Sequence, residues 1–424
     1  MKQIPFQIHS LGCKVNQYDA ASLRKELEAL GFIYSDLPRL IIVNTCSVTK
    51  QAIVKDKQLI NKLKKLYPGA MFLIMGCWLE TDKQSFDNLD KLLGIDKDKL
   101  LLWGVGRSRE LLARIKERFK VETDPAIDKT NLVSTDKSRY FLKVGDGCNQ
   151  FCSYCIIPYA RGRLKSRAIN DIVNEAKKAT EAGYFEIILS GIHLGRYGQD
   201  GKHKTSLLLL LKKLLKIKDL GRIRLSSIEV NEISSELIEL MAKNRKMCQH
   251  LHISLQSGSN RILEKMNRPY DKKYFENKVR SLRKKMPNIA ISTDLIVGFP
   301  TESEKEYRES YNFVKKISFS KVHVFPFSAH EITAAYQMQP KVERKIIKQR
   351  AKELRDLSDL LEKKYEEKIM KRYKGKEMLL VFENNRRIKN NQIIVAKNEY
   401  GFNLMIKGEK LKKIKAREAF KLII

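Results

Sequence analysis

The fold is decided by a short stretch near the middle of the chain, residues 140–155, which reads YFLKVGDGCNQFCSYC. Its first seven residues have the length and apolar character of a β-strand. Three cysteines follow in the pattern C-x-x-x-C-x-x-C, namely Cys148, Cys152 and Cys155. Thiolates hold iron–sulfur clusters, and three ligands in one loop leave one iron of a four-iron cluster open. A zinc site would have a fourth Cys or His close by, and none follows this triplet closely. The pattern therefore predicts an iron–sulfur site rather than a zinc site or three unrelated cysteines.

Strands and helices alternate from this stretch to about residue 330. The strand candidates read YFLKVGD, FEIILSG, IRLSSIE, HLHISLQ, IAISTDLIVG and KVHVFPF, with helical segments between them such as 170–182 and 303–316. Such alternation is typical of a parallel sheet with crossover helices. Six units predict a partial (β/α)6 barrel, and a flat doubly wound sheet is the alternative.

The first 125 residues show the same alternation and predict an N-terminal parallel α/β domain. The short apolar runs FQIH, LIIVN and AMFLIM are followed by amphipathic helical stretches at 19–30 and 50–67. A cysteine stands just past each run: Cys13, Cys46 and Cys77.

Ligands in open α/β sheets gather outside the carboxyl ends of the strands. The separations of 33 and 31 residues between these cysteines each match one strand–helix repeat. Gly12 and Gly76 precede two of them and would allow a close backbone approach. We therefore expect the three cysteines to converge and to hold a second cluster. Three buried structural cysteines are the alternative.

The last part of the chain changes character. A long charged helix is expected at 341–372, and the short strands EMLLVFEN, QIIVAKN, GFNLMIKG and FKLII then predict a small all-β barrel. Residues 371–424 contain 15 Lys and Arg against 5 Asp and Glu, which favours an RNA-binding face. The aromatic residues Phe382, Tyr400, Phe402 and Phe420 fit the barrel core better than that face. The predicted domains are 1–125, 138–370 and 371–424, with a polar linker at 121–137.

The composition points to an anionic partner. The formal net charge of the 424 residues is +34, which indicates nucleic acid first and an anionic membrane second, although Lys-rich usage in the source proteome explains part of it. No apolar run reaches the roughly 18 residues of a membrane span, and no signal-peptide core forms at the start. We expect a cytoplasmic protein whose cysteines are ligands rather than disulfides, with Cys248 as a core residue.

The motif at 148–155 resembles the radical S-adenosylmethionine (SAM) signature. In that superfamily the open iron is chelated by SAM, which is cleaved to methionine and a 5′-deoxyadenosyl radical. The resemblance implies SAM contacts from Tyr154 in the cysteine loop and from Ser190 and Gly191 at the end of the second strand. Ser254 and Gln256 alternate with apolar residues near the end of a later strand and are candidate contacts to SAM or to the substrate. Thr293, a polar residue in an otherwise apolar strand, has either a cofactor role or a structural one. His250 and His252 alternate with apolar neighbours on the same predicted strand as Ser254 and are expected to satisfy local polar groups.

Two cysteine triplets, a barrel and a small basic β-barrel together resemble the methylthiotransferase family, over essentially the whole chain. Within it, LGCKVNQYDA, NTCSVT and MGCW look like the subgroup that modifies N6-threonylcarbamoyladenosine in tRNA. The C-terminal barrel resembles the RNA-binding TRAM domain. One departure lies at 327–335, where His330 and Ile332 replace the arginine and glycine usual in relatives.

The resemblance implies two [4Fe–4S] clusters, SAM, the tRNA anticodon loop and an electron donor, with no membrane and no stable protein partner. No catalytic residue beyond the cluster ligands is predicted. The expected product is the 2-methylthio derivative of N6-threonylcarbamoyladenosine at position 37. The alternatives are N6-isopentenyladenosine tRNA or a ribosomal-protein aspartate as substrate, and a non-enzymatic iron–sulfur RNA-binding protein.

A threonylcarbamoyl group ends in a carboxylate, so its pocket needs cationic or hydrogen-bonding donors. The loops beside the cysteines offer Lys14, Asn16, Gln17, Arg161 and Arg163 as candidates, and the two arginines suit phosphates equally well.

Overall fold

The computed structural model describes residues 3–82, 88–106, 108–122, 138–201, 205–388, 391–407 and 419–424. These residues form two compact units. The first comprises the described parts of 1–135, 147–163 and 328–333, and the second those of 136–146, 164–327 and 334–424. The predicted linker at 121–137 lies almost wholly outside the described residues, and the three-domain division stays a prediction.

The first unit is built on a five-stranded parallel sheet in the order β2-β1-β3-β4-β5. Its strands are β1 (Ile4–Ser10), β2 (Phe32–Tyr34), β3 (Leu40–Thr45), β4 (Met71–Gly76) and β5 (Leu100–Trp103). The three strands predicted from the sequence are β1, β3 and β4, and they are neighbours at the centre of the sheet. The edge strands β2 and β5 were not predicted, because runs of three or four residues show no clear period.

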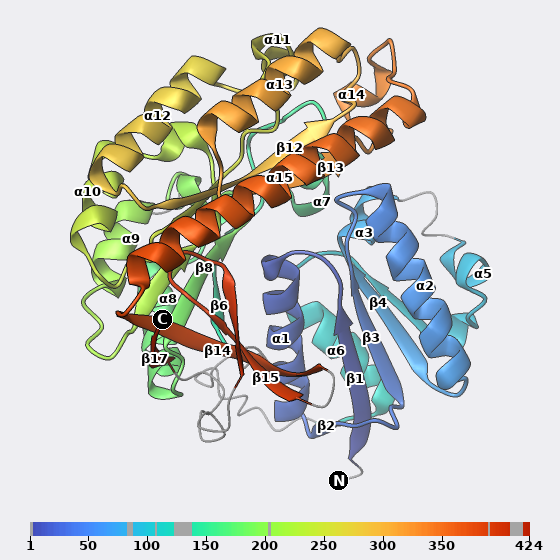
Figure 1. The fold of residues 1–424 in the computed structure, drawn as a ribbon. Helices are drawn as coiled ribbons and strands as arrows, with labels where there is room; N and C mark the ends of the chain where they lie inside the picture. The colour runs from blue at the N-terminus through green and yellow to red at the C-terminus, as the bar shows by residue number, and fades with distance from the viewer. Residues whose placement is uncertain are drawn as a thin grey trace. The chain divides into compact units, whose positions relative to one another are not determined.

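Helices cover both faces of this sheet (Figure 1). One face packs against α1 (Lys14–Ala29) and α6 (Ser108–Phe119). The other packs against α2 (Lys50–Leu66), α3 (Cys77–Thr81) and α5 (Leu89–Leu93). Because side chains alternate along a strand, the fully buried apolar run of β3 serves both faces.

The second unit contains the predicted partial barrel. One sheet has the order β7-β6-β8-β9 and the next has β10-β11-β12-β13, and every pair is parallel except β7 with β6. The strands are β6 (Tyr140–Asp146), β7 (Lys165–Ser166), β8 (Glu186–Gly191), β9 (Arg222–Leu225), β10 (Ser227–Ile228), β11 (His250–Ile253), β12 (Ala290–Val297) and β13 (Lys321–Pro326). The third predicted strand is interrupted at Ser226, so its two halves belong to different sheets. Six parallel positions, one of them split, confirm the (β/α)6 prediction.

Helices line the outer side of these sheets (Figure 1). They are α8 (Ile169–Glu181), α9 (Leu207–Leu214), α10 (Ser235–Lys243), α11 (Asn260–Lys265), α12 (Lys272–Lys285) and α13 (Glu304–Ile317), with the short α14 (Ala334–Gln337) after β13. The single-turn helices are η1 (Lys97–Lys99) in the first unit and η2 (Leu194–Arg196) and η3 (Val230–Glu232) in the second. None of the helices in the described ranges combines the length and apolarity needed to cross a bilayer.

The predicted long helix is α15 (Arg344–Tyr373), and it packs along β13. The Ser358 hydroxyl accepts the backbone N–H of Val322 at 3.0 Å and donates to its carbonyl at 3.1 Å. β13 is the last strand of its sheet, so the Ser358 side chain makes the hydrogen bonds to Val322 that a further strand would otherwise make.

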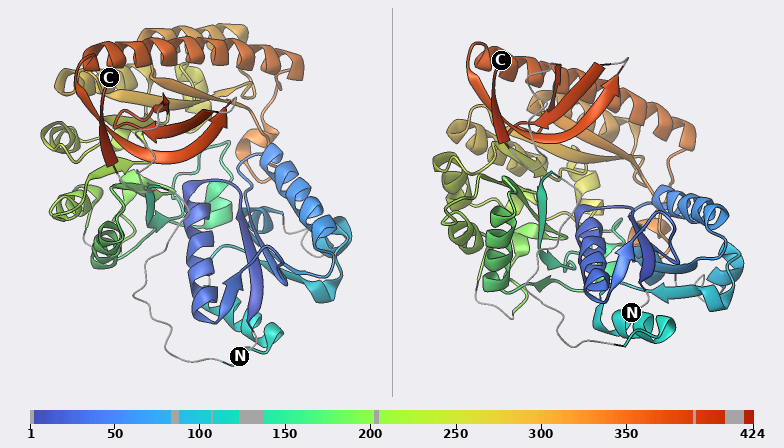
Figure 2. Two further views of the ribbon diagram at one scale, coloured as in Figure 1. Left: turned by 60° about the horizontal axis from the view of Figure 1, so that its bottom comes forward. Right: turned by 90° about the horizontal axis from the view of Figure 1, so that it is seen from below.

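The C-terminal strands form an antiparallel sheet in the order β16-β15-β14-β17 (Figure 2). They are β14 (Glu377–Ile388), β15 (Asn391–Lys397), β16 (Asn403–Lys407) and β17 (Ala419–Ile423). Phe382, Tyr400 and Phe402 are buried in a core shared with Ile369 of α15 and Ala290 of β12. The core assignment of these aromatics is confirmed, and the sheet shares its core with the barrel unit.

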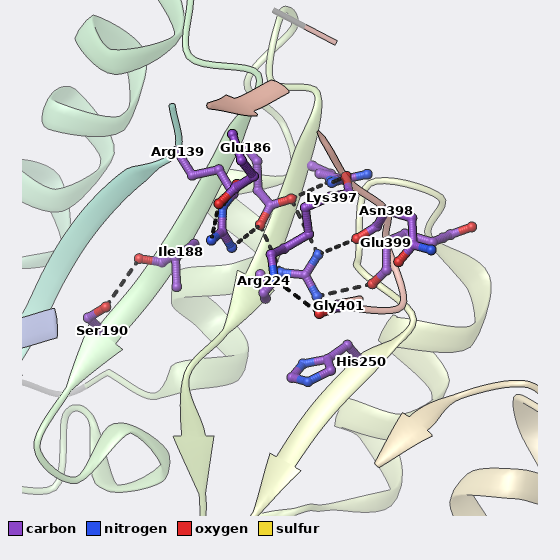
Figure 3. Close-up of polar contacts among 12 residues, drawn as sticks. Arg139, Glu186, Ile188, Ser190, Arg224, His250, Lys397, Asn398, Glu399 and Gly401 are labelled. Carbon is purple, nitrogen blue, oxygen red and sulfur yellow. Dashed lines mark hydrogen bonds and ion pairs between the residues drawn. The ribbon is translucent and has the colours of Figure 1, made fainter. Parts of the chain in front are cut away.

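A buried carboxylate holds this sheet to the barrel. Glu186 is fully buried at the start of β8 and is paired with Arg139 and Arg224 at 3.3 and 2.8 Å (Figure 3). It is also paired with a third arginine, Arg222, at 2.5 Å. Burial alone would raise the pKa of Glu186, but the three guanidinium groups outweigh it and hold this pKa well below its usual value.

The same arginines continue into the C-terminal sheet. Arg224 donates to the carbonyls of Asn398 and Glu399 at 2.9 and 3.1 Å, and Arg222 donates to the carbonyl of Lys397 at 2.9 Å. Lys397 ends β15, and Asn398 and Glu399 belong to the turn that follows it (Figure 3). One carboxylate thus anchors two cations that fix the turn.

We expect Glu186→Gln to lower the free energy of unfolding by about 3–5 kcal/mol, because it leaves buried guanidinium groups without a counter-charge. Since folding lowers the pKa of Glu186, the full loss of unfolding free energy should be present at neutral pH. It should shrink as the pH falls below about 4.3 and through the folded pKa. Thermal unfolding followed by circular dichroism measures it. Glu276→Gln, at surface ion pairs with Lys316 and Arg280, is the matched control and should cost less than about 1 kcal/mol. Equal losses in both variants would contradict the anchoring role.

Candidate functional site

Cys13, Cys46 and Cys77 lie at the carboxyl ends of β1, β3 and β4, three adjacent parallel strands. Cys13 is the N-cap of α1, Cys46 directly follows β3, and Cys77 is the first residue of α3. The predicted convergence is confirmed in that all three cysteines reach the same edge of one sheet. The role of these cysteines as cluster ligands stays a prediction.

The glycines before two of these cysteines are required by the backbone. Gly12 and Gly76 have φ values of +104° and +107°, which side-chain-bearing residues rarely adopt. A Cβ atom at Gly12 would lie 2.8 Å from the Cβ of Cys46, and one at Gly76 would lie 2.6 Å from the carbonyl oxygen of Thr45. The close backbone approach expected from the sequence is present.

We expect Gly76→Ala to destabilise the first unit by more than about 2 kcal/mol, because strain from the positive φ adds to the overlap with Thr45. Gly69→Ala is the matched control. Gly69 lies in the turn before β4, and a Cβ there meets no atom within 4 Å. The control should change stability by less than about 0.5 kcal/mol. Thermal unfolding of both variants tests the difference, and a tolerated Gly76→Ala would refute it.

A single buried amide organises the edge of the sheet. Asn16 is 0% exposed, and its Nδ2 donates to the carbonyls of Leu11 at 3.0 Å and Thr45 at 2.9 Å. Its Oδ1 lies 3.7 Å from the Cys13 sulfur and 4.0 Å from the Cys77 sulfur. Both amide hydrogens are used internally, so the expectation that Asn16 donates to a substrate is wrong.

Arg161 joins this site from the other cysteine loop. It ends α7 (Ile157–Arg161), and its side chain is 1% exposed. Its Nε donates to the Cys77 sulfur at 3.3 Å, and its Nη2 donates to Oδ1 of Asn16. Both terminal nitrogens lie 3.2 Å from Oδ2 of Asp19. The expectation that Arg161 donates to a substrate is therefore also wrong. Of the other candidates, Arg163 is exposed and Gln17 is half-buried.

The buried thiols are costly to ionise without a metal. Burial raises the pKa of Cys46 to about 11 and that of Cys77 to about 12, and Arg161 lowers both pKa values in part. A coordinating metal ion supplies the positive charge that a buried thiolate needs. Three thiols at one sheet edge with a cation beside them fit a thiolate-ligated cluster.

Asp56 of α2 was missed from the sequence, where it looks like one more charge on an amphipathic helix. It is fully buried, and its Oδ2 accepts the backbone N–H of Cys46 at 2.9 Å. Burial raises its pKa to about 7, and the bond from Cys46 opposes this shift. Asp56 thus holds the backbone of Cys46 in place by a hydrogen bond.

The second triplet lies in a tight loop after β6. The backbone N–H of Cys148 donates to the carbonyl of Gly162 at 3.0 Å, and that of Cys155 donates to the carbonyl of Cys152 at 3.0 Å. Cys152 is buried and the other two cysteines are half-buried. Both triplets belong to the first unit.

No three His, Cys, Asp or Glu side chains in the described ranges converge closely enough to share one metal ion. A four-iron cluster binds each cysteine through a different iron atom, so its ligands do not need to converge on one point.

The predicted SAM contacts lie on the barrel strands and in the loop. Ser190 and Gly191 end β8, where Gly191 pairs with Gly145 of β6. The Ser190 hydroxyl is 1% exposed and donates to the carbonyl of Ile188 at 3.5 Å (Figure 3). Tyr154 is half-buried in the cysteine loop.

The other three lie at β11 and β12. Ser254 and Gln256 follow β11, both largely buried, and Gln256 has a φ of +67°. The Thr293 hydroxyl donates to the carbonyl of Ile253 at 2.6 Å and accepts the N–H of Leu255 at 3.0 Å. Thr293 therefore has a structural role between β11 and β12. The cofactor roles of all six residues remain predictions.

A chain of polar side chains runs along the same strands. His252 contacts Ser292 at 3.0 Å and Asp294 at 3.1 Å, and His250 contacts Ser292 at 3.3 Å. Burial lowers the pKa of His323 on β13, and the neighbouring His252 adds to this shift. The expectation that His250 and His252 satisfy local polar groups is confirmed.

Residues 328–333, which include the unusual His330 and Ile332, belong to the first unit. His330 is 7% exposed, and its Nε2 lies 3.3 Å from the carbonyl oxygen of Val48. The Ser328 hydroxyl accepts the backbone N–H of Lys50 at 2.9 Å. Both contacts hold the loop that follows Cys46, whereas Ile332 is exposed.

Comparisons with known proteins agree with this arrangement. Residues 142–314 match the radical SAM superfamily, and residues 5–94 match the family described as uncharacterized protein family UPF0004. These two matches each contain one cysteine triplet.

Two relatives are 36% identical to this chain, both named threonylcarbamoyladenosine tRNA methylthiotransferase MtaB. The Bacillus subtilis protein aligns over 84% of this chain and 81% of its own length, and the Aquifex aeolicus protein over 92% and 96%. A Thermoanaerobacter protein named tRNA-2-methylthio-N(6)-dimethylallyladenosine synthase is 32% identical, over 84% of this chain and 78% of its own.

Among solved structures, the radical SAM methyltransferase TsrM from Kitasatospora setae, with cobalamin and a [4Fe–4S] cluster bound, superposes with a TM-score of 0.59. It is 16% identical and covers 79% of this chain and 77% of its own. At this identity the likeness shows the fold alone.

Proposed function

This chain belongs to the radical SAM methylthiotransferases, and we propose that it adds a methylthio group to carbon 2 of N6-threonylcarbamoyladenosine at position 37 of tRNA. The observation that carries the reaction class is the identity of 36% to named tRNA methylthiotransferases over up to 92% of the chain. The positions of the two cysteine triplets support it.

Cys148, Cys152 and Cys155 would hold the cluster that binds SAM, and Cys13, Cys46 and Cys77 would hold the second. Bound [4Fe–4S] clusters and SAM supply the radical and sulfur-transfer chemistry of this family. The chain's own residues order the ligands: Asp56 fixes the backbone of Cys46, and the loop closes through the Cys148 amide.

The choice of substrate rests on two weaker observations. Relatives named for threonylcarbamoyladenosine are 33–37% identical, against 32–33% for those named for dimethylallyladenosine. Lys14 and Arg163 are exposed beside the two triplets, and cations of this kind suit the carboxylate of a threonylcarbamoyl group. An isopentenyl group would need only apolar walls.

We expect about eight irons per chain after anaerobic reconstitution, because each triplet can hold a four-iron cluster. Cys152→Ala should remove about half of the iron and abolish SAM cleavage. Cys46→Ala should also remove about half, yet leave SAM cleavage intact while stopping methylthio formation. Iron analysis and chromatography of 5′-deoxyadenosine measure these outcomes. Cys248→Ala, a buried cysteine outside both triplets, is the control and should keep all the iron. Loss of SAM cleavage in a Cys46 variant that retains four irons would contradict the assignment.

The substrate is tested with purified enzyme on tRNA bearing each modified adenosine separately. Mass analysis of the nucleosides should show the 2-methylthio product only from the threonylcarbamoyl form. Arg163→Gln should raise the KM for that tRNA about tenfold or more, because it removes a charged hydrogen bond to the carboxylate. Turnover of the isopentenyl form alone would overturn the substrate while leaving the reaction class in place.

A further inference from the structure

Arg161 is a buried cation that follows one cysteine triplet in the sequence and contacts a cysteine of the other. It lies six residues after Cys155 at the end of α7, so the loop of the SAM motif carries it. Its guanidinium nevertheless contacts Asn16 and Asp19 of α1 and Cys77 of α3, the helices that follow β1 and β4. All of these residues are in the first unit.

The buried guanidinium of Arg161 lies beside one carboxylate and two neutral polar groups. An arginine stays protonated in proteins, and burying its charge is costly unless it is paired. The carboxylate partner is Asp19, whose own side chain is 22% exposed. The guanidinium also donates to a neutral amide oxygen and to the Cys77 sulfur. A negatively charged sulfur at Cys77 would make the second of these a charge-assisted hydrogen bond.

The geometry also selects arginine over lysine. Nε points to the Cys77 sulfur, while the terminal nitrogens point to Asn16 and Asp19. A planar fork can reach three partners in fixed directions, whereas an ammonium group is a single point charge. Arg161 thus contacts the Cys77 sulfur directly and the amide oxygen of Asn16, which itself lies 3.7 Å from the Cys13 sulfur.

We propose that Arg161 is a positioning residue that ties the SAM-motif loop to the N-terminal thiols and raises the reduction potential of the cluster they hold. The inference rests on the proposed second cluster at Cys13, Cys46 and Cys77. Hydrogen bonds to ligand sulfurs and nearby positive charge stabilise the reduced, more negative cluster, and both raise its potential.

The test isolates the N-terminal cluster in the full chain. Cys152→Ala serves as the parent, and Arg161→Gln, Arg161→Lys and Arg163→Gln are each added to it. Iron content, the midpoint potential from a redox titration followed by electron paramagnetic resonance, and the melting temperature are measured for all four proteins. Arg163 is the matched control because it lies two residues away and is exposed.

We expect about four irons in each protein. The potential should become more negative in Arg161→Gln, shift less in Arg161→Lys, and stay unchanged in Arg163→Gln. Loss of iron from both Arg161 variants with an unchanged melting temperature also supports the proposal, because the ligands are then misplaced in a folded chain.

Unchanged potentials with full iron would overturn the proposal, and so would unfolding of both Arg161 variants, which would make the residue merely structural. A parent that binds no iron would instead refute the second cluster itself, so the two failures are distinguishable.

Discussion

Parallel strands that pair in register end along one edge of their sheet, and in the first unit this constraint places three cysteines together. β1, β3 and β4 are adjacent, and a cysteine follows each of them within three residues. The glycines at 12 and 76 let the backbones approach, and Asn16 ties the ends of β1 and β3 by hydrogen bonds. The thiols, the buried carboxylate of Asp56 and the guanidinium of Arg161 all take their positions from this edge.

The same logic explains which parts of the fold the sequence could predict. The runs FQIH, LIIVN and AMFLIM are mainly apolar, and a cysteine stands just past each run, so β1, β3 and β4 and the positions of the cysteines at their ends were predictable. β2 has three residues and no period of its own. The break at Ser226 between β9 and β10 depends on where the sheets bend, which no local pattern records.

The cysteines of the site were predictable from the sequence, but the hydrogen bonds and ion pairs around them were not. Polar residues beside Cys13 looked like substrate donors, because spacing along a chain does not show which of them turn inward. Asn16 is fully buried, whereas Lys14 is exposed. Asp56 and Arg161 meet their partners at separations of 10 and 84 residues, and such pairings arise only from the tertiary fold.

The first unit is discontinuous, and this has a consequence for biosynthesis. Residues 147–163 and 328–333 complete a unit that begins at the N-terminus, and they supply Arg161 beside Cys77 and His330 beside the loop after Cys46. A nascent chain therefore holds its first three thiols in an unfinished setting until residue 333 has left the ribosome. The surroundings of these three thiols are therefore complete only after most of the chain has been synthesised.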